Sequence, residues 1–302
     1  MTLLHPDEVD IDEATIHRLI ARQLPDRAHL DLSPAGHGTD NRMLRLGDDL
    51  VVRLPRKPGT AAHVGKEQAW LPRLAPHLPI AVPEPVALGR AGDGYPFPWS
   101  VYRWIDGSEL DPDAVEDPVR LGRDLAGFVH ALQAVDLMGA RREEPLSSYR
   151  GGSLRELAGS TFENLAACRD LSGLDLDLAG LEAIWRAAME LDEPRDAHTW
   201  MHTDLKPSNL LVREGVLVGV VDFGGLSVGA PTCEHAATWD LPPEARHAYA
   251  DALGLDRGTR QRARAWALAI ALSGVPYYWS TWPEFVQECL RRLRLVLDDA
   301  DG

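Results

Sequence analysis

Cysteine is scarce in this sequence, and no apolar run is long enough to span a membrane. Three cysteines, Cys168, Cys233 and Cys289, are spread over 302 residues and form no Cys-x-x-Cys pair. Their spacing indicates neither a disulfide framework nor a zinc site. The best apolar stretch, residues 265–275, has about the length of a core helix and falls short of the roughly 18 residues of a transmembrane segment. We therefore expect no membrane partner.

Basic residues are also in short supply. Lysine and arginine total 31 against 46 acidic residues, which gives a formal net charge of -15 at pH 7. A nucleic-acid-binding protein usually has a basic face, so we expect no nucleic-acid partner. The acidity fits a cationic partner, but many soluble proteins are acidic without one. The first twelve residues lack the apolar core of a signal peptide, which favours a cytoplasmic protein.

The length and the order of the hydrophobic patterns predict two lobes. Residues 30–54 alternate in the manner of paired strands, and they follow a helix predicted over residues 11–23. Apolar residues at helical spacing predict another helix over residues 60–74. Two further strands are expected, over residues 82–88 and 98–105.

Beyond residue 107 the pattern becomes helical. Apolar residues from 121 to 135 recur at intervals of three and four, which is typical of one helix face. Further helices are expected over residues 153–169, 179–191, 233–239, 243–253, 259–273 and 283–298. We place a hinge at Trp104-Ile105-Asp106-Gly107, which predicts an N-terminal lobe over residues 1–104 and a C-terminal lobe over residues 105–302.

The stretch with the clearest chemistry runs from His202 to Gly224. It is predicted to form a strand hairpin that carries Asp204 and Asn209 at one end and returns Asp222 close to them. Two carboxylates and an amide oxygen suit a hard, oxygen-preferring cation such as Mg²⁺. The spacing His-x-Asp-x-x-x-x-Asn with a later Asp-Phe-Gly is that of a kinase catalytic loop and metal-binding loop. The alternative interpretation is an exposed acidic hairpin.

With these motifs, the chain resembles the aminoglycoside phosphotransferase family, within the group that includes choline kinases and other small-molecule kinases. The resemblance covers nearly the whole chain and is to the actinobacterial branch of that family. The stretches that carry it are residues 35–56, 66–79, 95–104, 202–229 and Val275-Pro276-Tyr277-Tyr278. It implies a two-lobed, protein-kinase-like α+β fold. A small, mainly β N-terminal lobe would bind nucleotide, and a larger, mainly helical C-terminal lobe would hold the catalytic residues and the acceptor.

The resemblance implies a role for each polar residue of the hairpin. Asp204 is expected to accept, or at least orient, the proton of the attacking hydroxyl. Asn209 and Asp222 are expected to bind the Mg²⁺ that bridges the phosphates of ATP or GTP. Lys206 would add positive charge near the γ-phosphate, or else it is a solvated loop lysine. Phosphoryl transfer depends mainly on positioning and charge stabilisation, so a base and metal-held phosphates are the minimum set.

The resemblance also implies nucleotide contacts in the N-terminal lobe. Arg53 stands where better-known relatives have a lysine that holds phosphate, and Glu67 stands where they have the glutamate that orients it. A guanidinium can make both contacts with a different geometry. The loop that contains Thr39 is expected to cover the phosphates. Backbone groups near Arg103 and Ile105 are expected to receive the adenine.

Some positions depart from the family pattern. Thr203 replaces the usual glycine, which predicts an altered acceptor pocket. The family usually reads Gly-Asp-Pro-x-x-Asp-Leu where this chain has Gly-Ala-Pro-Thr-Cys-Glu-His, over residues 229–235. Ala230 therefore loses a carboxylate, and Glu234 lengthens the one that is expected to brace the catalytic loop. These two changes put the rigidity of the loop and the activity in question.

The resemblance places the acceptor over Asp204, against the C-terminal helices. Aromatic faces and carboxylates suit a sugar-like or aminated ligand, although aromatic residues near a helix turn usually belong to the core. The expected contacts are Asp204, Glu234, Asp240, Tyr278, Trp279, Trp282 and Glu284.

The sequence therefore predicts Mg²⁺-dependent transfer of the γ-phosphate of ATP or GTP to a hydroxyl of a small molecule, aminoglycoside-like by resemblance. The nearest alternative is a kinase for another alcohol, such as choline, a macrolide or an amino-sugar metabolite. A second alternative is a nucleotide-binding protein with little catalysis, which Ala230 and Glu234 make conceivable. The choice between ATP and GTP, and between monomer and homodimer, stays open at this point.

Overall fold

The structure is a computed structural model that describes residues 8–36, 40–192 and 197–299. The chain forms two compact units. Unit 1 consists of Met1–Gly107 and Gly219–Leu226, and unit 2 consists of Ser108–Val218 and Ser227–Gly302. The return of a short segment to unit 1 was not expected from the sequence. The assignment of nucleotide binding to residues 1–104 and of catalysis to residues 105–302 stays a prediction.

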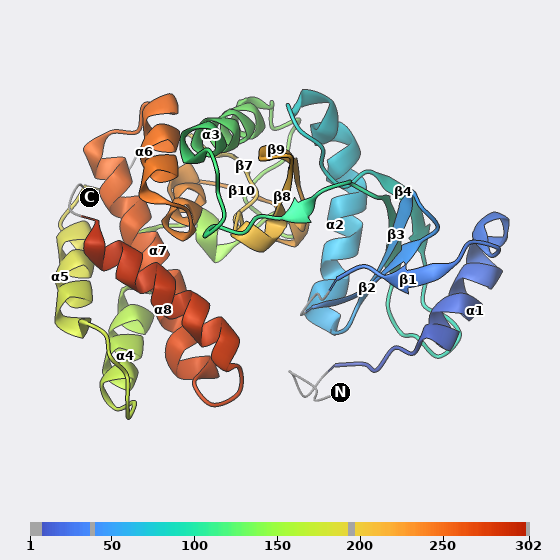
Figure 1. The fold of residues 1–302 in the computed structure, drawn as a ribbon, viewed down its shortest axis with the longest axis horizontal. Helices are drawn as coiled ribbons and strands as arrows, with labels where there is room; N and C mark the ends of the chain where they lie inside the picture. Colours follow the sequence, from blue (N-terminus) through green and yellow to red (C-terminus); the bar gives the residue numbers. More distant parts are fainter. Residues whose placement is uncertain (1–7, 37–39, 193–196, 300–302) are drawn as a thin grey trace. The chain divides into compact units, whose positions relative to one another are not determined.

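Unit 1 is built on one antiparallel sheet, as predicted. Its strand order is β1-β2-β3-β5-β4 (Figure 1). The hairpin between β2 and β3 turns at Gly47, whose φ of 59° lies in the left-handed region that glycine adopts without strain. The strands are β1 (Leu32–Pro34), β2 (Asn41–Leu46), β3 (Leu50–Pro55), β4 (Pro85–Gly89) and β5 (Trp99–Arg103).

Helices cover both faces of this sheet (Figure 1). Helix α1 (Glu13–Gln23) begins at an Asp12 cap, which accepts a hydrogen bond from the Thr15 backbone N–H at 2.7 Å. Its buried face packs on the sheet core, in which Trp99 is fully buried. Helix α2 (Pro58–Leu74) contacts β3, β4 and β5.

Unit 2 is mainly helical, and its central element is the long helix α7. Helix α7 packs against α4, α5 and α8, while α3 packs against α6 (Figure 1). Trp185 and Trp266 are buried in this core. The helices are α3 (Pro118–Ala134), α4 (Ala158–Arg169), α5 (Leu178–Met189), α6 (Pro243–Ala252), α7 (Arg257–Tyr278) and α8 (Pro283–Asp298).

Short strands carry the functional loops. One small sheet has the order β6-β8-β9, and a second consists of β10 and β7 in antiparallel register. The strands are β6 (Ser108–Glu109), β7 (Thr199–Met201), β8 (Leu210–Arg213), β9 (Val216–Val220) and β10 (Ser227–Gly229). The hairpin expected after Asn209 is thus present as β8 and β9.

Three predicted helices differ from the structure. The helix expected over residues 153–169 is divided into a 3₁₀ turn, Leu154–Leu157, and α4. The helix expected over 233–239 is a 3₁₀ segment, Pro231–Asp240. Helix α7 continues past its expected end because the fully buried Leu272 and Val275 hold the last turns in the core despite Pro276. Among the described helices, none combines the length and the apolar character needed to cross a membrane.

The close packing of α3 on α6 depends on a glycine. A Cβ on Gly122 would lie 2.1 Å from the backbone oxygen of Ala245, whereas a Cβ on Gly127 of the same helix meets nothing within 4 Å. We expect Gly122→Ala to lower the free energy of unfolding by about 1–3 kcal/mol because backbone has to move. Gly127→Ala is the matched control and should raise it by up to about 1 kcal/mol. Urea unfolding measures both, and equal effects would contradict the packing argument.

Candidate active site

The catalytic loop begins where β7 ends and is held by one buried carboxylate. Glu234 Oε1 accepts a hydrogen bond from the His202 backbone N–H at 2.9 Å, and Oε2 accepts one from the Thr203 backbone N–H at 2.8 Å. Thr203 has a φ of 70°, which is uncommon for a residue with a branched side chain. Two hydrogen bonds to one buried carboxyl group thus hold the loop in a conformation that the chain alone does not favour.

The side chain of Glu234 braces the loop, although its extra length had put the rigidity of the loop in question. It is longer than the aspartate usual in the family, yet it reaches both backbone N–H groups of the loop. Only 2% of the residue is exposed. Burial raises the pKa of Glu234 to about 7, although the two N–H donors and Arg150 act in the opposite direction. Because both oxygens accept backbone hydrogen bonds, Glu234 braces the loop, and its expected contact with the acceptor stays a prediction.

Asp204 is partly exposed and lies between cations. Its Oδ1 accepts a hydrogen bond from Arg150 Nη1 at 2.9 Å, and its Oδ2 lies 4.0 Å from Lys206 Nζ. About 34% of its side chain is accessible to solvent. Burial alone would raise the pKa of Asp204, but the charges of Arg150 and Lys206 outweigh it, so the pKa lies below its ordinary value. Asp204 is therefore a carboxylate at neutral pH.

Asn209 is oriented by the same loop. Its Nδ2 donates hydrogen bonds to the Asp204 backbone oxygen at 2.8 Å and to Asp204 Oδ2 at 3.2 Å. The residue is buried in the 3₁₀ turn Pro207–Asn209. Because the amide nitrogen points to Asp204, its side-chain oxygen is the atom suited to be a metal ligand.

A second set of polar residues lies in unit 1. Arg53 is on β3, and its Nη1 donates to Glu67 Oε1 at 2.8 Å and to Oε2 at 3.0 Å. Its Nη2 forms an ion pair with Asp222. Glu67, on α2, also accepts a hydrogen bond from the Tyr102 hydroxyl. Burial alone would lower the pKa of Arg53, but Glu67 and Asp222 raise it, so the guanidinium stays charged.

The Asp-Phe-Gly segment is anchored to α2. Lys66 Nζ donates a hydrogen bond to the Gly224 backbone oxygen at 2.7 Å. Asp222 has a φ of 62°, and 42% of its side chain is exposed. The left-handed backbone at Asp222, together with this anchor, turns a carboxylate toward solvent at a defined position.

These residues fit a divalent cation of the magnesium type. Mg²⁺ is usually held by one or two protein oxygens together with the phosphates of a substrate. The exposed carboxylate of Asp222, in unit 1, and the side-chain oxygen of Asn209, in unit 2, are each a hard ligand of this kind. Within the described residues, no group of three or more His, Cys, Asp or Glu side chains could hold a metal by itself. The expected role of Asp222 and Asn209 as metal ligands stays a prediction.

The other expected nucleotide contacts are less defined. Thr39 lies outside the described residues. Arg103 ends β5, and its backbone N–H donates to the Glu84 oxygen at 2.9 Å, so that N–H is already used. Ile105 follows the strand end and is partly buried. The adenine contacts at Arg103 and Ile105 stay predictions.

The expected acceptor contacts fall into two groups. Asp240 is buried and paired with Arg292, whose Nε donates to Asp240 Oδ1 at 2.6 Å, and its expected contact with a cationic acceptor stays a prediction. Tyr278 packs edge to face on Trp282, with ring centroids 5.5 Å apart. Trp279 is partly buried against the core, and Glu284 is exposed in the first turn of α8. The acceptor contacts of these last residues stay predictions.

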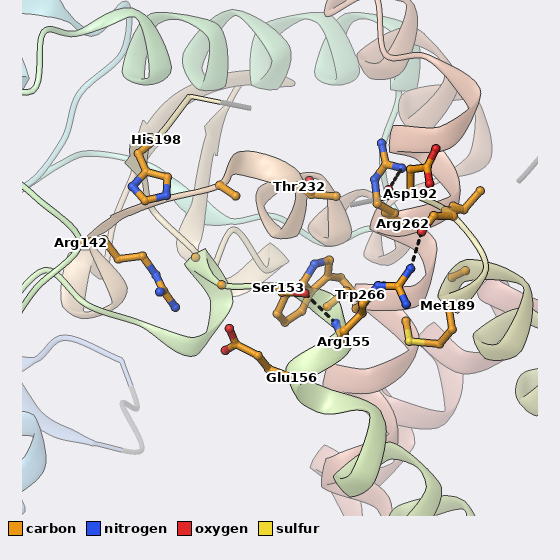
Figure 2. Close-up of a pocket in the computed structure, with 16 residues that line it drawn as sticks. Arg142, Ser153, Arg155, Glu156, Met189, Asp192, His198, Thr232, Arg262 and Trp266 are labelled. Carbon is orange, nitrogen blue, oxygen red and sulfur yellow. Dashed lines mark hydrogen bonds between the residues drawn. The ribbon is translucent and has the colours of Figure 1, made fainter. Parts of the chain in front are cut away.

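A cavity of about 230 Å³ opens in unit 2 beside Gly151 and Gly152, the residues that follow Arg150. Figure 2 shows Arg142, Arg155 and Arg262 around it. Arg155 Nη2 donates to the Leu191 backbone oxygen at 2.8 Å. Over the described ranges of the chain, three buried polar atoms of its lining have no hydrogen-bond partner, namely Arg142 Nε, Thr232 Oγ1 and Arg262 Nε. The lining is polar and richer in arginine than in carboxylate.

Sequence reasoning missed three residues that define the geometry. Arg150 contacts Asp204, Lys66 anchors Gly224, and Tyr102 donates to Glu67. Lys66 and Tyr102 lie in stretches that resemble the family, so their position near Glu67 was a usable signal. Arg150 lies between the helices that were expected around residues 121–135 and 153–169, and no motif pointed to it.

The pKa of Glu234 predicts how stability depends on pH. The folded-state pKa of about 7 lies above the ordinary value of 4.5. Stability from such a group is fully present below the unfolded-state pKa and is lost as pH rises through the folded-state pKa. We expect the wild-type protein to lose about 3 kcal/mol of unfolding free energy from this residue over that interval.

Glu234→Gln cannot ionise and should lack that part of the pH slope. The comparison uses urea unfolding of both proteins at several pH values from about 4.5 to about 8. Glu163→Gln, on the exposed face of α4, is the surface control and should keep the wild-type slope. Parallel curves for wild type and Glu234→Gln would contradict the assignment.

The Arg53 cluster makes a separate prediction. Arg53→Met leaves Glu67, which is 2% exposed, without its cation. Breaking a buried pair costs about 3–5 kcal/mol, so unfolding free energy should fall by that amount. Arg103→Met removes an arginine that faces Glu84 in an exposed pair and should cost about 1 kcal/mol or less. Equal losses in urea unfolding would show that the Arg53 cluster is not a buried charge network.

Comparisons with known proteins identify the fold and the family of this chain. The GDP and kanamycin complex of APH(2")-IIia matches with a TM-score of 0.73 and 20% identity, over 94% of this chain and 98% of that chain. Wild-type aminoglycoside 2'-phosphotransferase-IIIa with GDP matches with a TM-score of 0.72 and 20% identity, over 95% and 99%. Macrolide 2'-phosphotransferase MphH from Brachybacterium faecium matches with a TM-score of 0.58 and 23% identity, over 93% and 97%.

At these identities the solved structures show the fold, and they confirm the two-lobed, kinase-like α+β class that the sequence predicted. A search of curated proteins finds no match. The model of the phosphotransferase enzyme family matches residues 31–266, which include Arg53, Glu67, Asp204, Asn209 and Asp222. The chain belongs to the phosphotransferase enzyme family.

Proposed function

We propose that this protein transfers the γ-phosphate of ATP or GTP, with Mg²⁺, to a hydroxyl of a small, sugar-containing molecule. The observation that carries the proposal is the partly exposed carboxylate of Asp204. It is held in a loop that Glu234 fixes, in a chain of the phosphotransferase enzyme family. A fixed, ionised carboxylate at that position suits a hydroxyl nucleophile.

Asp204 orients the attacking hydroxyl by accepting its hydrogen bond. Its pKa is below the ordinary value, so it is a weak base, and its main contribution is alignment of the nucleophile. Lys206 adds a positive charge near Asp204 that offsets the charge of the transferred phosphoryl group. Glu234 contributes by keeping the backbone of the loop in place.

Nucleotide binding falls to the Arg53 cluster and the metal ligands. Arg53, fixed by Glu67, pairs with phosphate oxygens. Asn209 and Asp222 are the residues that would hold Mg²⁺, which would neutralise charge on the phosphates. Thr39, and the backbone near Arg103 and Ile105, complete the nucleotide contacts. Relatives crystallised with GDP and with ADP support a purine nucleotide and do not decide between ATP and GTP.

The acceptor belongs to the class that the relatives' names describe. Those names include kanamycin, gentamicin and streptomycin complexes and two macrolide 2'-phosphotransferases. An aminoglycoside-like or macrolide-like antibiotic is therefore the first candidate, with Tyr278, Trp279, Trp282 and Glu284 as its contacts. Choline or an amino-sugar metabolite is the alternative acceptor. The cytoplasmic location and the monomer or homodimer state are predictions from the sequence.

Phosphate transfer to a panel of aminoglycosides and macrolides tests this proposal. We expect wild-type protein to phosphorylate at least one acceptor with ATP or GTP in the presence of Mg²⁺. Asp204→Ala should lower kcat by roughly 10²- to 10⁴-fold and leave nucleotide binding within a fewfold. Tight nucleotide binding without transfer to any acceptor would favour the non-catalytic alternative. Nearly full turnover by Asp204→Ala would remove Asp204 from the mechanism.

A further inference from the structure

Arg150 reaches the candidate catalytic residue from a loop that no motif singles out. Its Nη1 donates to Asp204 Oδ1 at 2.9 Å and also to the Thr203 backbone oxygen. Its Nε donates to the Tyr149 hydroxyl at 3.0 Å. About 21% of the Arg150 side chain is exposed beside the 34% of Asp204. A molecule that places a hydroxyl on Asp204 therefore meets this guanidinium as well.

The charged side chains near Asp204 favour an oxygen-bearing group over an ammonium group. The carboxylate of Glu234 is used by two backbone N–H groups, and that of Asp240 is paired with Arg292. Lys206 adds a second cation at 4.0 Å from Asp204. Glu234 and Asp240, which the sequence suggested as cation contacts, thus already have partners within the fold. Arg150 and Lys206 are the cations near Asp204.

The cavity lined by Gly151 and Gly152 also has more cationic than acidic side chains. Arg142, Arg155 and Arg262 line it, against Glu156 and Asp192 as the acidic side chains (Figure 2). The whole chain has a net charge of -15, but this cavity lining contains more arginine than acidic side chains. Gly151 and Gly152 of this lining directly follow Arg150 in the chain.

We propose that Arg150 is a specificity-determining residue, which selects acceptors that place a hydroxyl, ether or carboxylate oxygen, and not an ammonium, beside the reacting hydroxyl. This inference rests on the proposed phosphotransferase function and narrows its acceptor class. It does not require an acceptor free of amines, because ammonium groups elsewhere on the molecule do not meet Arg150. An oxygen accepts a hydrogen bond from the guanidinium, whereas an ammonium next to it is repelled.

A matched pair of sugars isolates this effect. Glucosamine and glucose differ in one amino or hydroxyl group, and each is measured by kcat/KM where phosphate is transferred and by its dissociation constant otherwise. We expect glucose to be favoured over protonated glucosamine by roughly tenfold or more, since like charges in contact cost at least that near a protein surface. Raising the pH until the amine is neutral should reduce this preference, because Arg150 stays charged.

Variants assign the preference to one side chain. Arg150→Gln should reduce the preference for glucose to within a fewfold, and Arg150→Lys, which keeps the charge, should retain most of it. Arg186→Gln on α5 is the control, because Arg186 also pairs with a carboxylate, that of Glu182, with Nη2 2.6 Å from Oε1. It should keep the wild-type preference. If Arg150→Gln does not fold, the pH dependence of the wild-type preference still decides the matter.

Two outcomes would overturn the proposal. Wild-type protein could favour glucosamine over glucose, or Arg150→Gln could keep the wild-type preference while remaining folded and active. Both differ from a failure of the proposed function, which would be loss of phosphate transfer to every acceptor of the antibiotic and sugar panels despite nucleotide binding.

Discussion

The two hydrogen bonds that Glu234 accepts from the catalytic loop are the constraint on which the site in unit 2 depends. They fix the backbone at His202 and Thr203, including a positive φ at Thr203 that a threonine does not favour. The position of Asp204, the next residue, follows from that backbone. The carboxylate of Asp204 then orients Asn209 and pairs with Arg150. One buried acidic side chain thus fixes the positions of Asp204, Asn209 and their cationic neighbour Arg150.

Unit 1 has a comparable arrangement, in which the central buried charge is a cation instead of a carboxylate. Arg53 is buried on β3, and its guanidinium satisfies Glu67 and Asp222 together. Lys66 holds the backbone beyond Asp222 through the Gly224 oxygen. The proposed contact of Arg53 with phosphate would replace part of this pairing. Each unit therefore presents charged groups whose positions are fixed by its own packing.

Sequence patterns predicted the helices and strands better than the side-chain contacts of the candidate site. The sheet hairpin around Gly47 and the helix over residues 283–298 were expected because alternation, turn glycine and apolar periodicity are local signals. The role of Arg150 was not predictable, since its contact with Asp204 spans 54 positions and the turn Tyr149–Gly151 is placed by packing on β10 and on the segment Pro231–Asp240. The family resemblance also identified Glu234 as a brace candidate, but it could not show that each of its two oxygens accepts a backbone hydrogen bond.

We propose that Asp222 binds the metal of the nucleotide complex, whereas Asp204 orients the hydroxyl of the acceptor. Calorimetric titration of ATP with and without Mg²⁺, on wild type, Asp222→Asn and Asp204→Asn, tests it most directly. We expect Mg²⁺ to strengthen ATP binding to wild type and to Asp204→Asn by a similar factor. Asp222→Asn should lose most of that gain, by roughly tenfold or more. An equal loss in both variants, or none in Asp222→Asn, would contradict the account.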